Sequence, residues 1–217
     1  MLVGLGTWQI QRLHWKEALI AARQTQMSAP AIELPATVDP VDLEYRRIAL
    51  TGRFLHDREL YLGSRPHRGV VGFGVVTPLV LSDGREILVH RGWVPPQRKD
   101  PERRPEGLVE GTVTLEAVAR TDGWKGSDWF RPDNVPRDNY WHWVDLPAMA
   151  QHADLETPVL EIYVDAVVDA PGGLPIAVPP RINLRNDHLL YAFTWYTLAF
   201  ALLIIYVIYH TRRNTPV

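Results

Sequence analysis

The feature that most constrains this 217-residue chain is a long apolar stretch near its C-terminus, residues 189–209, which contains no charged side chain. As an α-helix this stretch rises about 31 Å, which matches the roughly 30 Å hydrocarbon layer of a bilayer. Aromatic side chains near both ends suit the two membrane interfaces: Tyr191, Trp195, Tyr196, Tyr206 and Tyr209. We therefore predict a transmembrane helix over residues 188–213, in preference to a buried core helix, which needs a shorter apolar run.

Charges on the two sides of this stretch predict its orientation. Asp187 precedes it, and Arg212 and Arg213 follow it directly. Because arginine and lysine favour the cytoplasmic side, residues 214–217 are expected to form a cytoplasmic tail. The bulk of the chain then lies on the opposite side, the periplasmic side of a bacterial inner (cell) membrane or its mitochondrial equivalent.

The N-terminal segment also suggests contact with a membrane. Residues 1–6 are apolar but too short to span a bilayer, and no basic residue precedes them, so they do not form a signal peptide. In the helix-favouring residues that follow, Trp8, Arg12 and Trp15 share one face. Our hypothesis is that residues 1–26 comprise the end of a first transmembrane helix, inside which this sequence starts, and an interfacial helix.

Between these ends, residues 27–187 are rich in strand signals. Prolines at 30, 35 and 40 indicate a linker over residues 28–40, and Gly52 indicates a hairpin or bulge between two alternating segments. A short helix is expected over residues 146–152, capped by Asp145. The predicted strands cover residues 43–51, 54–62, 70–81, 86–94, 111–120 and 159–168. The predicted fold class is α+β: a β-rich antiparallel extracytoplasmic domain with a C-terminal transmembrane helix and the remnant of an N-terminal one.

Composition excludes several classes of function. The chain has no cysteine, which excludes disulfides, thiolate metal sites and a cysteine nucleophile. Its formal net charge of −2 gives no sign of nucleic-acid binding. The sequence contains no nucleotide-binding loop, nucleophile elbow or zinc-protease motif, and nothing pairs its acidic residues into an acid–base site. We therefore expect a protein that is not an enzyme.

His188 stands apart from the other histidines because it directly precedes the apolar stretch. On a helix it shares a face with Tyr191, Ala192 and Trp195, at spacings of three, four and seven residues. An imidazole at a membrane surface, next to a small residue and two aromatic rings, suits a flat apolar ligand with a metal centre, and haem iron takes histidine as an axial ligand. The alternative is that Asn186 or Asp187 caps the helix and His188 is merely interfacial.

Four motifs then resemble one family. They are Gly6-Thr7-Trp8-Gln9 with Arg12-Leu13 and Trp15-Lys16; Gly52-Arg53-Phe54 with Glu59-Leu60-Tyr61-Leu62-Gly63; Val89-His90-Arg91-Gly92-Trp93-Val94-Pro95; and His188-Leu189-Leu190-Tyr191-Ala192-Phe193-Thr194-Trp195. Together they are similar to the signatures of the Surfeit-locus-one family of cytochrome c oxidase assembly factors. The matches run in order from residue 6 to about residue 200.

The resemblance implies a role in the maturation of haem-copper oxidases, by transient binding of haem a and its delivery to the catalytic subunit. It implies His188 as the metal ligand, with Tyr191, Ala192 and Trp195 beside the haem. Arg91 could pair with a haem propionate, although an internal ion pair at a strand corner is the favoured interpretation. Implied partners are the oxidase catalytic subunit, the lipid bilayer and, as a further candidate, the haem a synthesis machinery. The alternative function is a non-haem membrane scaffold that stabilises an oxidase subunit during assembly.

Overall fold

The computed structural model describes residues 1–217 except 122, 125, 181, 183–185 and 214–217, and it describes Arg212 and Arg213 by their backbone alone. The chain divides into two compact units. Unit 1 combines the two ends of the chain, Met1–Thr25 and Ile182–Val217, and unit 2 is the middle, Gln26–Arg181. Each unit has its own architecture.

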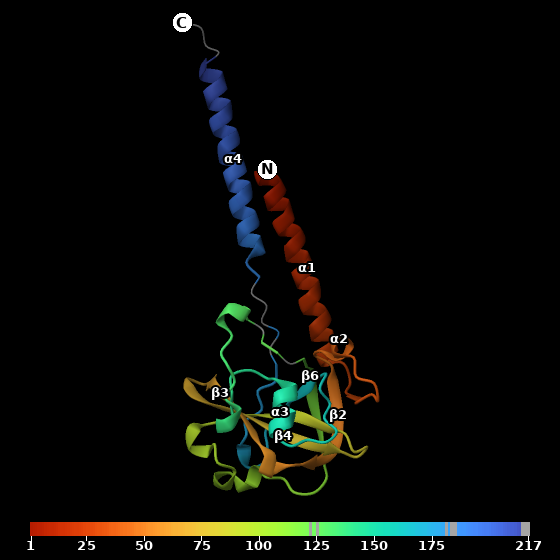
Figure 1. Ribbon diagram of the computed structural model, residues 1–217. Helices are drawn as coiled ribbons and strands as arrows, with labels where there is room; N and C mark the ends of the chain where they lie inside the picture. Colours follow the sequence, from red (N-terminus) through yellow and green to blue (C-terminus); the bar gives the residue numbers. More distant parts are fainter. Residues whose placement is uncertain (122, 125, 181, 183–185, 214–217) are drawn as a thin grey trace. The chain divides into compact units, whose positions relative to one another are not determined.

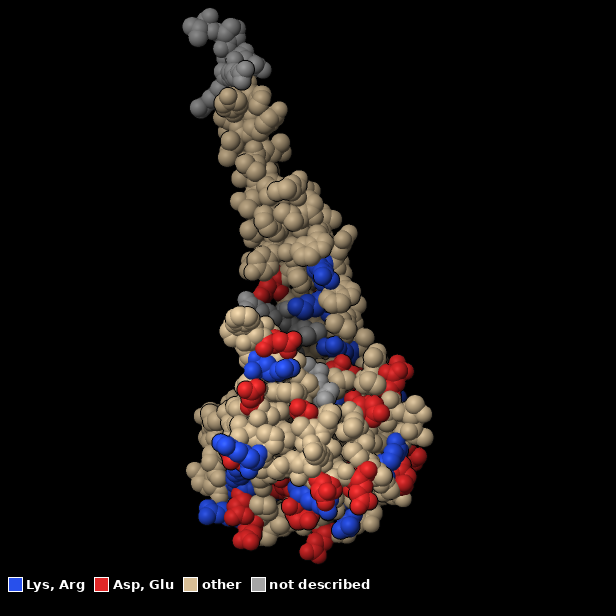
Figure 2. All heavy atoms as spheres, in the orientation of Figure 1, with Lys and Arg blue, Asp and Glu red and all other residues tan. Residues whose placement is uncertain are grey.

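Unit 1 consists of two long helices that run antiparallel. Helix α1 spans Leu2–Ser28, its last residues lying in unit 2, and helix α4 spans His188–Arg213. Residues His188–Thr211 form the one helix among the described residues that is long and apolar enough to cross a membrane. Figure 2 shows its surface free of charged side chains, and its residues from Phe200 onward are exposed all round. A helix that is apolar on every side needs lipid or another apolar partner to cover it.

Unit 2 is built on one eight-stranded sheet that closes on itself (Figure 1). The strand order is β1-β2-β6-β8-β5-β4-β3-β7, and β2 also pairs with β4, so that β2, β6, β8, β5 and β4 form a closed ring. The strands are β1 Ile32–Glu33, β2 Arg47–Phe54, β3 Leu60–His67, β4 Val70–Leu81, β5 Glu86–Val94, β6 Val113–Arg120, β7 Tyr140–Trp141 and β8 Tyr163–Ala166. Most pairings are antiparallel, but β1–β2, β3–β7 and β5–β8 are parallel.

Short helical segments connect the strands. Two are α-helices, α2 Pro40–Leu43 and α3 Leu146–His152. The others are 3₁₀ turns: η1 His56–Arg58, η2 Pro96–Arg98, η3 Pro101–Arg103, η4 Pro105–Gly107, η5 Asp128–Phe130, η6 Pro136–Asp138 and η7 Pro171–Gly173. Proline occupies the start of most of them, as its fixed φ favours.

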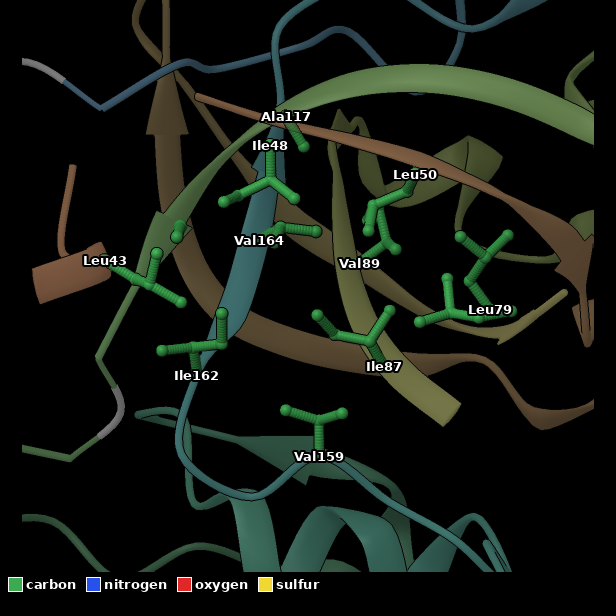
Figure 3. Close-up of a cluster of buried hydrophobic side chains, with 12 residues drawn as sticks. Leu43, Ile48, Leu50, Leu79, Ile87, Val89, Ala117, Val159, Ile162 and Val164 are labelled. Carbon is green, nitrogen blue, oxygen red and sulfur yellow. The ribbon is translucent and has the colours of Figure 1, made fainter. Parts of the chain in front are cut away.

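Two apolar clusters hold unit 2 together. The first fills the closed ring of strands, where alternate residues such as Ile48, Leu50, Ile87, Val89 and Val164 point inward (Figure 3). The second lies between the sheet and α3, around a fully buried Trp141. The two clusters are possible because the strands that they share bury both faces, as in β5, where nearly every side chain is buried.

Much of this architecture agrees with the sequence-based expectation. The mixed α+β class and the antiparallel character of the sheet are confirmed, and the predicted bounds of β4, β5 and α3 match the structure residue for residue. Asp145 caps α3, since its carboxylate accepts from the backbone N–H of Ala148 at 3.2 Å. The strand predicted over residues 159–168 is shorter than expected, and only Tyr163–Ala166 pairs in the sheet.

Three local predictions were wrong. The strand predicted over residues 54–62 does not form as one element, because η1 lies within it and β3 begins only at Leu60. Residues 28–40 are not merely a linker, because β1 pairs there with β2. Gly52 does not separate two strands but lies inside β2, paired with Leu81 and Val113 on either side. A Cβ atom at Gly52 would lie 2.2 Å from the carbonyl oxygen of Val80, so glycine is needed here for the close approach of β4.

Candidate functional site

The two helices of unit 1 meet where a glycine on one faces an aromatic ring on the other. Gly6 is the buried residue of α1, and a Cβ atom there would lie 2.8 Å from the Tyr196 ring. The Thr7 and Tyr196 hydroxyl groups are 3.1 Å apart and share a hydrogen bond. Small residues that admit close packing, supported by polar contacts across the pair, are typical of helix association in membranes.

Two turns from Tyr196, a second polar contact joins the helices. His188 Nδ1 lies 2.6 Å from Gln9 Oε1. A carbonyl oxygen can only accept, so Nδ1 is the donor in this contact, and Nε2 is then the unprotonated nitrogen in the neutral form of the ring. Nε2 has no hydrogen-bond partner among the described residues. Histidines that bind metals are held in this way, with one ring nitrogen donating to an oxygen and the other left for the metal.

The predicted face of α4 is divided in the structure. His188, Ala192 and Tyr196 follow one another at four-residue spacing, and the first and last of these contact α1. Ala192 lies between them and is 1% exposed. Tyr191 is 53% exposed and Trp195 half-buried, so they flank the line of contact with α1. Ala192 therefore allows the two helices to pack closely, while Tyr191 and Trp195 lie next to the part of α4 that α1 does not cover.

The polar side of α1 bears the predicted interfacial cluster. The guanidinium of Arg12 lies over the rings of Trp8 and Trp15, at 5.7 and 5.2 Å from their centroids. Both tryptophans are about half exposed, as suits side chains at a membrane interface. His14, a further histidine on this helix, is exposed and lies 3.5 Å from Glu17, so it is not the residue that contacts His188.

Arg91 belongs to unit 2, where it is 4% exposed. The residue forms a bulge in β5, because Val75 pairs with Gly92 and Val76 pairs with His90. Its guanidinium donates to the carbonyl of Gly107, lies 3.5 Å from the Glu59 carboxylate and covers the ring of Phe54. The internal ion pair favoured from the sequence is therefore present.

Glu59 is the centre of this buried cluster. Its carboxylate accepts from Arg104 as well as Arg91, and from the hydroxyl group of Thr77 at 3.2 Å. Burial alone raises the pKa of Glu59, but the His56 ring and the charges of Arg104 and Arg91 outweigh burial, so the pKa lies below its usual value. Burial lowers the pKa of Arg91 to about 10, which keeps it charged at neutral pH.

Unit 2 also has an open pocket of about 420 Å³ next to this cluster. Arg91 and Phe54 line one part, and the rest is largely apolar side chains of β6 and of residues 166–171. The volume falls within the range of small-ligand sites. The pocket is open, and the polar groups in its lining include the carboxylates of Glu116 and Asp169.

The donor set of unit 1 fits one kind of metal group. No three histidine, aspartate or glutamate side chains gather into a metal site in the part of the chain that the structure describes. A haem supplies four equatorial nitrogens to its iron, so it needs only one or two axial ligands from a protein. A single half-buried imidazole whose Nδ1 is held by Gln9, with Tyr191 and Trp195 on the same helix face, satisfies that need through Nε2.

Comparison with known proteins identifies the family of this chain. Residues 1–200 match the SURF1 family, which covers α1, unit 2 and the first half of α4. The chain belongs to the SURF1 family. It is 41% identical to human Surfeit locus protein 1 over 219 residues, covering 91% of this chain and 70% of the human protein. It is 39% identical to a SURF1-like protein of Monosiga brevicollis over 218 residues, covering 94% and 81% of the two chains.

Membership in the SURF1 family confirms the family resemblance seen in the four motifs. It also confirms the expectation of a protein that is not an enzyme, because SURF1 proteins are non-enzymatic assembly factors. Four residues of the helix contact were absent from the sequence-based site, namely Gly6, Thr7, Gln9 and Tyr196. Gln9 and Gly6 stand in the first motif and Tyr196 follows the last, but only the pairing of the helices shows what they contact.

Proposed function

We propose that this SURF1 protein is an assembly factor for a haem-copper (cytochrome c) oxidase that binds haem a transiently through His188 and delivers it to the catalytic subunit. The observation that carries the proposal is the contact between His188 Nδ1 and Gln9 Oε1, which leaves Nε2 as the available nitrogen. Family membership supports the oxidase context. When bound, the haem would supply an iron that can take an imidazole nitrogen as a ligand.

Each residue of the site has a distinct task in this proposal. His188 would supply the nitrogen ligand to the haem iron, Gln9 holds its ring in one tautomer, and Gly6 and Tyr196 set the distance between the helices. Tyr191 and Trp195 present aromatic faces beside the ligand and help to exclude water. A single histidine ligand at the edge of the helix pair would give a contact that can be exchanged, as a carrier requires. The proposal gives no haem contact to Arg91, because its guanidinium already bonds Gly107 and pairs with Glu59 within unit 2.

The proposal places α4 across a bacterial inner membrane, with unit 2 on the periplasmic side and the C-terminus in the cytoplasm. Support comes from the apolar surface of the helix and from Arg212 and Arg213 at its end. His188 then lies at the outer surface of the membrane, where a hydrophobic cofactor could pass laterally to another membrane protein. The oxidase catalytic subunit is the proposed recipient, and the haem a synthesis machinery is a candidate donor.

The test is the absorption spectrum of the full chain purified from cells that make haem a. We expect a haem a Soret band in the wild type and its loss in His188→Ala. His210→Ala is the matched control, because His210 lies on the same helix but is exposed and bonded only to the Tyr206 carbonyl. Thermal unfolding of the three proteins should coincide, which separates loss of the ligand from loss of the fold.

A non-haem scaffold is the second candidate function. It is favoured by the apolar pocket of unit 2, whose open shape suits a protein segment better than an enclosed cofactor. In that case the purified wild-type protein is colourless but still co-purifies with an oxidase subunit. A Soret band that persists unchanged in His188→Ala would instead move the haem site to another residue.

A further inference from the structure

One apolar surface feature belongs neither to the helix pair nor to the cores of unit 2. The 3₁₀ turn η5 carries two adjacent aromatic residues, Trp129 and Phe130, which are 88% and 77% exposed. Large aromatic side chains on a soluble surface usually pack against something, and two in succession at a loop tip are typical of an interaction site.

Hydrogen bonds within and next to this turn hold it in place. The indole N–H of Trp124 donates to the carbonyl of Ser127 at 2.9 Å, and the backbone N–H of Phe130 donates to the same carbonyl at 3.0 Å. Beyond the turn, the indole N–H of Trp143 donates to the carbonyl of Pro132 at 3.1 Å. Trp129 and Phe130 are therefore presented to the surroundings by an ordered loop, so little further ordering is needed for them to bind.

The connections of unit 2 limit how far it can lie from a membrane. Residues 182–187 link it to α4, and they span at most about 21 Å however they run. Within unit 2, η5 projects from the same end as α2, near which the chain enters the unit, whereas η2, η3 and η4 lie at the opposite end (Figure 1). The aromatic pair is thus on the end of unit 2 that carries a connection to the helices.

Charges around the pair nearly balance one another. Arg131 lies 3.7 Å from Asp128, and Arg137 lies 3.6 Å from Asp138, which leaves the exposed Asp133 outside these two pairs. A loop with paired charges has no strong preference for an anionic or a cationic surface. Its attraction must come from the aromatic rings, and tryptophan in particular favours the headgroup layer of a bilayer.

We propose that Trp129 and Phe130 insert into the interfacial layer of the phospholipid bilayer that α4 spans, and so form a second membrane contact of the chain. Two side chains offer too little area for a stable protein–protein interface, which typically buries about 1,200–2,000 Å². They suffice for a bilayer contact, because the tether keeps the local concentration of lipid high and no affinity is needed to bring the partners together.

The absence of cysteine from the sequence permits a clean test with one introduced label. Ser127→Cys adds a thiol to the exposed start of η5, where the serine hydroxyl makes no capping hydrogen bond. The full chain carrying an environment-sensitive NBD fluorophore at this cysteine is reconstituted into phosphatidylcholine vesicles with lipids that bear a doxyl quencher near the headgroup. Glu102→Cys, in the exposed turn η3 at the opposite end of unit 2, is the matched label position.

We expect the NBD emission at position 127 to be blue-shifted and quenched by the doxyl lipid. The emission at position 102 should be that of a fluorophore in water. Adding Trp129→Ser and Phe130→Ser to the first protein should reduce its quenching to that of position 102, with unchanged thermal unfolding. Added salt or phosphatidylglycerol should alter the quenching little. Equal signals at the two positions, or quenching that survives the double substitution, overturns the proposal. Shielding that appears only when an oxidase subunit is added overturns it in favour of a protein partner.

Discussion

The two polar clusters of this protein differ in how completely their bonding capacity is used. In unit 2, the Glu59 carboxylate accepts from Arg91, Arg104 and Thr77, and all three of its charged members are at most 5% exposed. In unit 1, His188 is half-buried and uses one ring nitrogen, on Gln9, while the other has no hydrogen-bond partner among the described residues.

The difference separates a structural cluster from a binding site. A buried charge network with every group satisfied has nothing to offer a ligand, and its disruption leaves uncompensated charges. An imidazole held by one hydrogen bond at a partly exposed position is still able to bind. The comparison therefore predicts that substitutions in the first cluster change stability and that substitutions in the second change ligand affinity.

The largest effect should come from Glu59→Ala. Removing the carboxylate leaves Arg91 and Arg104 buried without their counter-charge, which typically costs about 3–5 kcal/mol of unfolding free energy. Chemical denaturation of the full chain in detergent, followed by circular dichroism, measures the loss. For molecules that remain folded, the haem spectrum should not change.

Glu116→Ala is the matched control for this prediction. Glu116 also pairs with an arginine, Arg47, but its side chain is 50% exposed. Exposed ion pairs are usually worth at most about 1 kcal/mol, so the control should be nearly as stable as the wild type. If the two substitutions cost the same, the Glu59 cluster is not the structural centre that its burial implies.

The second effect concerns acid. The pKa of Glu59 in the folded protein lies below its usual value. In the unfolded chain the pKa returns to the usual glutamate value. Its contribution to stability is therefore complete above the usual glutamate pKa and is lost as the pH falls through the lower, folded pKa. Denaturation at a series of acidic pH values should show this loss, and Glu59→Gln should flatten the dependence. A variant that keeps the wild-type acid profile would assign the effect to other carboxylates.

The third effect tests the open cluster. Gln9→Leu removes the acceptor that fixes the His188 ring, and loss of such an outer partner typically weakens metal binding about 10- to 100-fold. Haem titration of the purified chain measures the affinity, while its thermal unfolding should change little. Gln11→Leu is the control, because Gln11 is an exposed glutamine on the same helix. Equal affinity in the two variants would mean that Gln9 does not position His188.

Sequence patterns predicted the parts of the molecule that local physics determines. The bounds of α3 follow from a capping aspartate and a first-turn proline, and those of β4 and β5 follow from β-branched runs around the turn at residues 82–85. The length and apolar character of α4 likewise depend on its own residues alone.

Features that depend on contacts between residues far apart in the chain could not be predicted from the sequence. Gly52 looks like a turn residue until β4 is placed against it, because only the approach of Val80 shows why no side chain fits. His188 was found by its position before an apolar run. Its partner Gln9 stands 179 residues away, and no local pattern links a glutamine on one helix to a histidine on another.

The smallest effect should come from the contact that closes the helix pair. Tyr196→Phe keeps the ring against Gly6 but removes the hydroxyl group that bonds Thr7. Hydrogen bonds between helices in membranes average about 0.6 kcal/mol, so haem affinity should fall by about threefold or less.

Gly6→Leu, by contrast, drives a side chain into the ring and should separate Gln9 from His188, with a loss of affinity similar to that of Gln9→Leu. Haem titration of both variants decides whether the open cluster depends on the packing of the pair or on its hydrogen bond. If Tyr196→Phe weakens binding as much as Gly6→Leu does, the hydroxyl contact has a direct part in the site. Tyr196 then belongs to the binding residues of unit 1 and not only to its structural contacts.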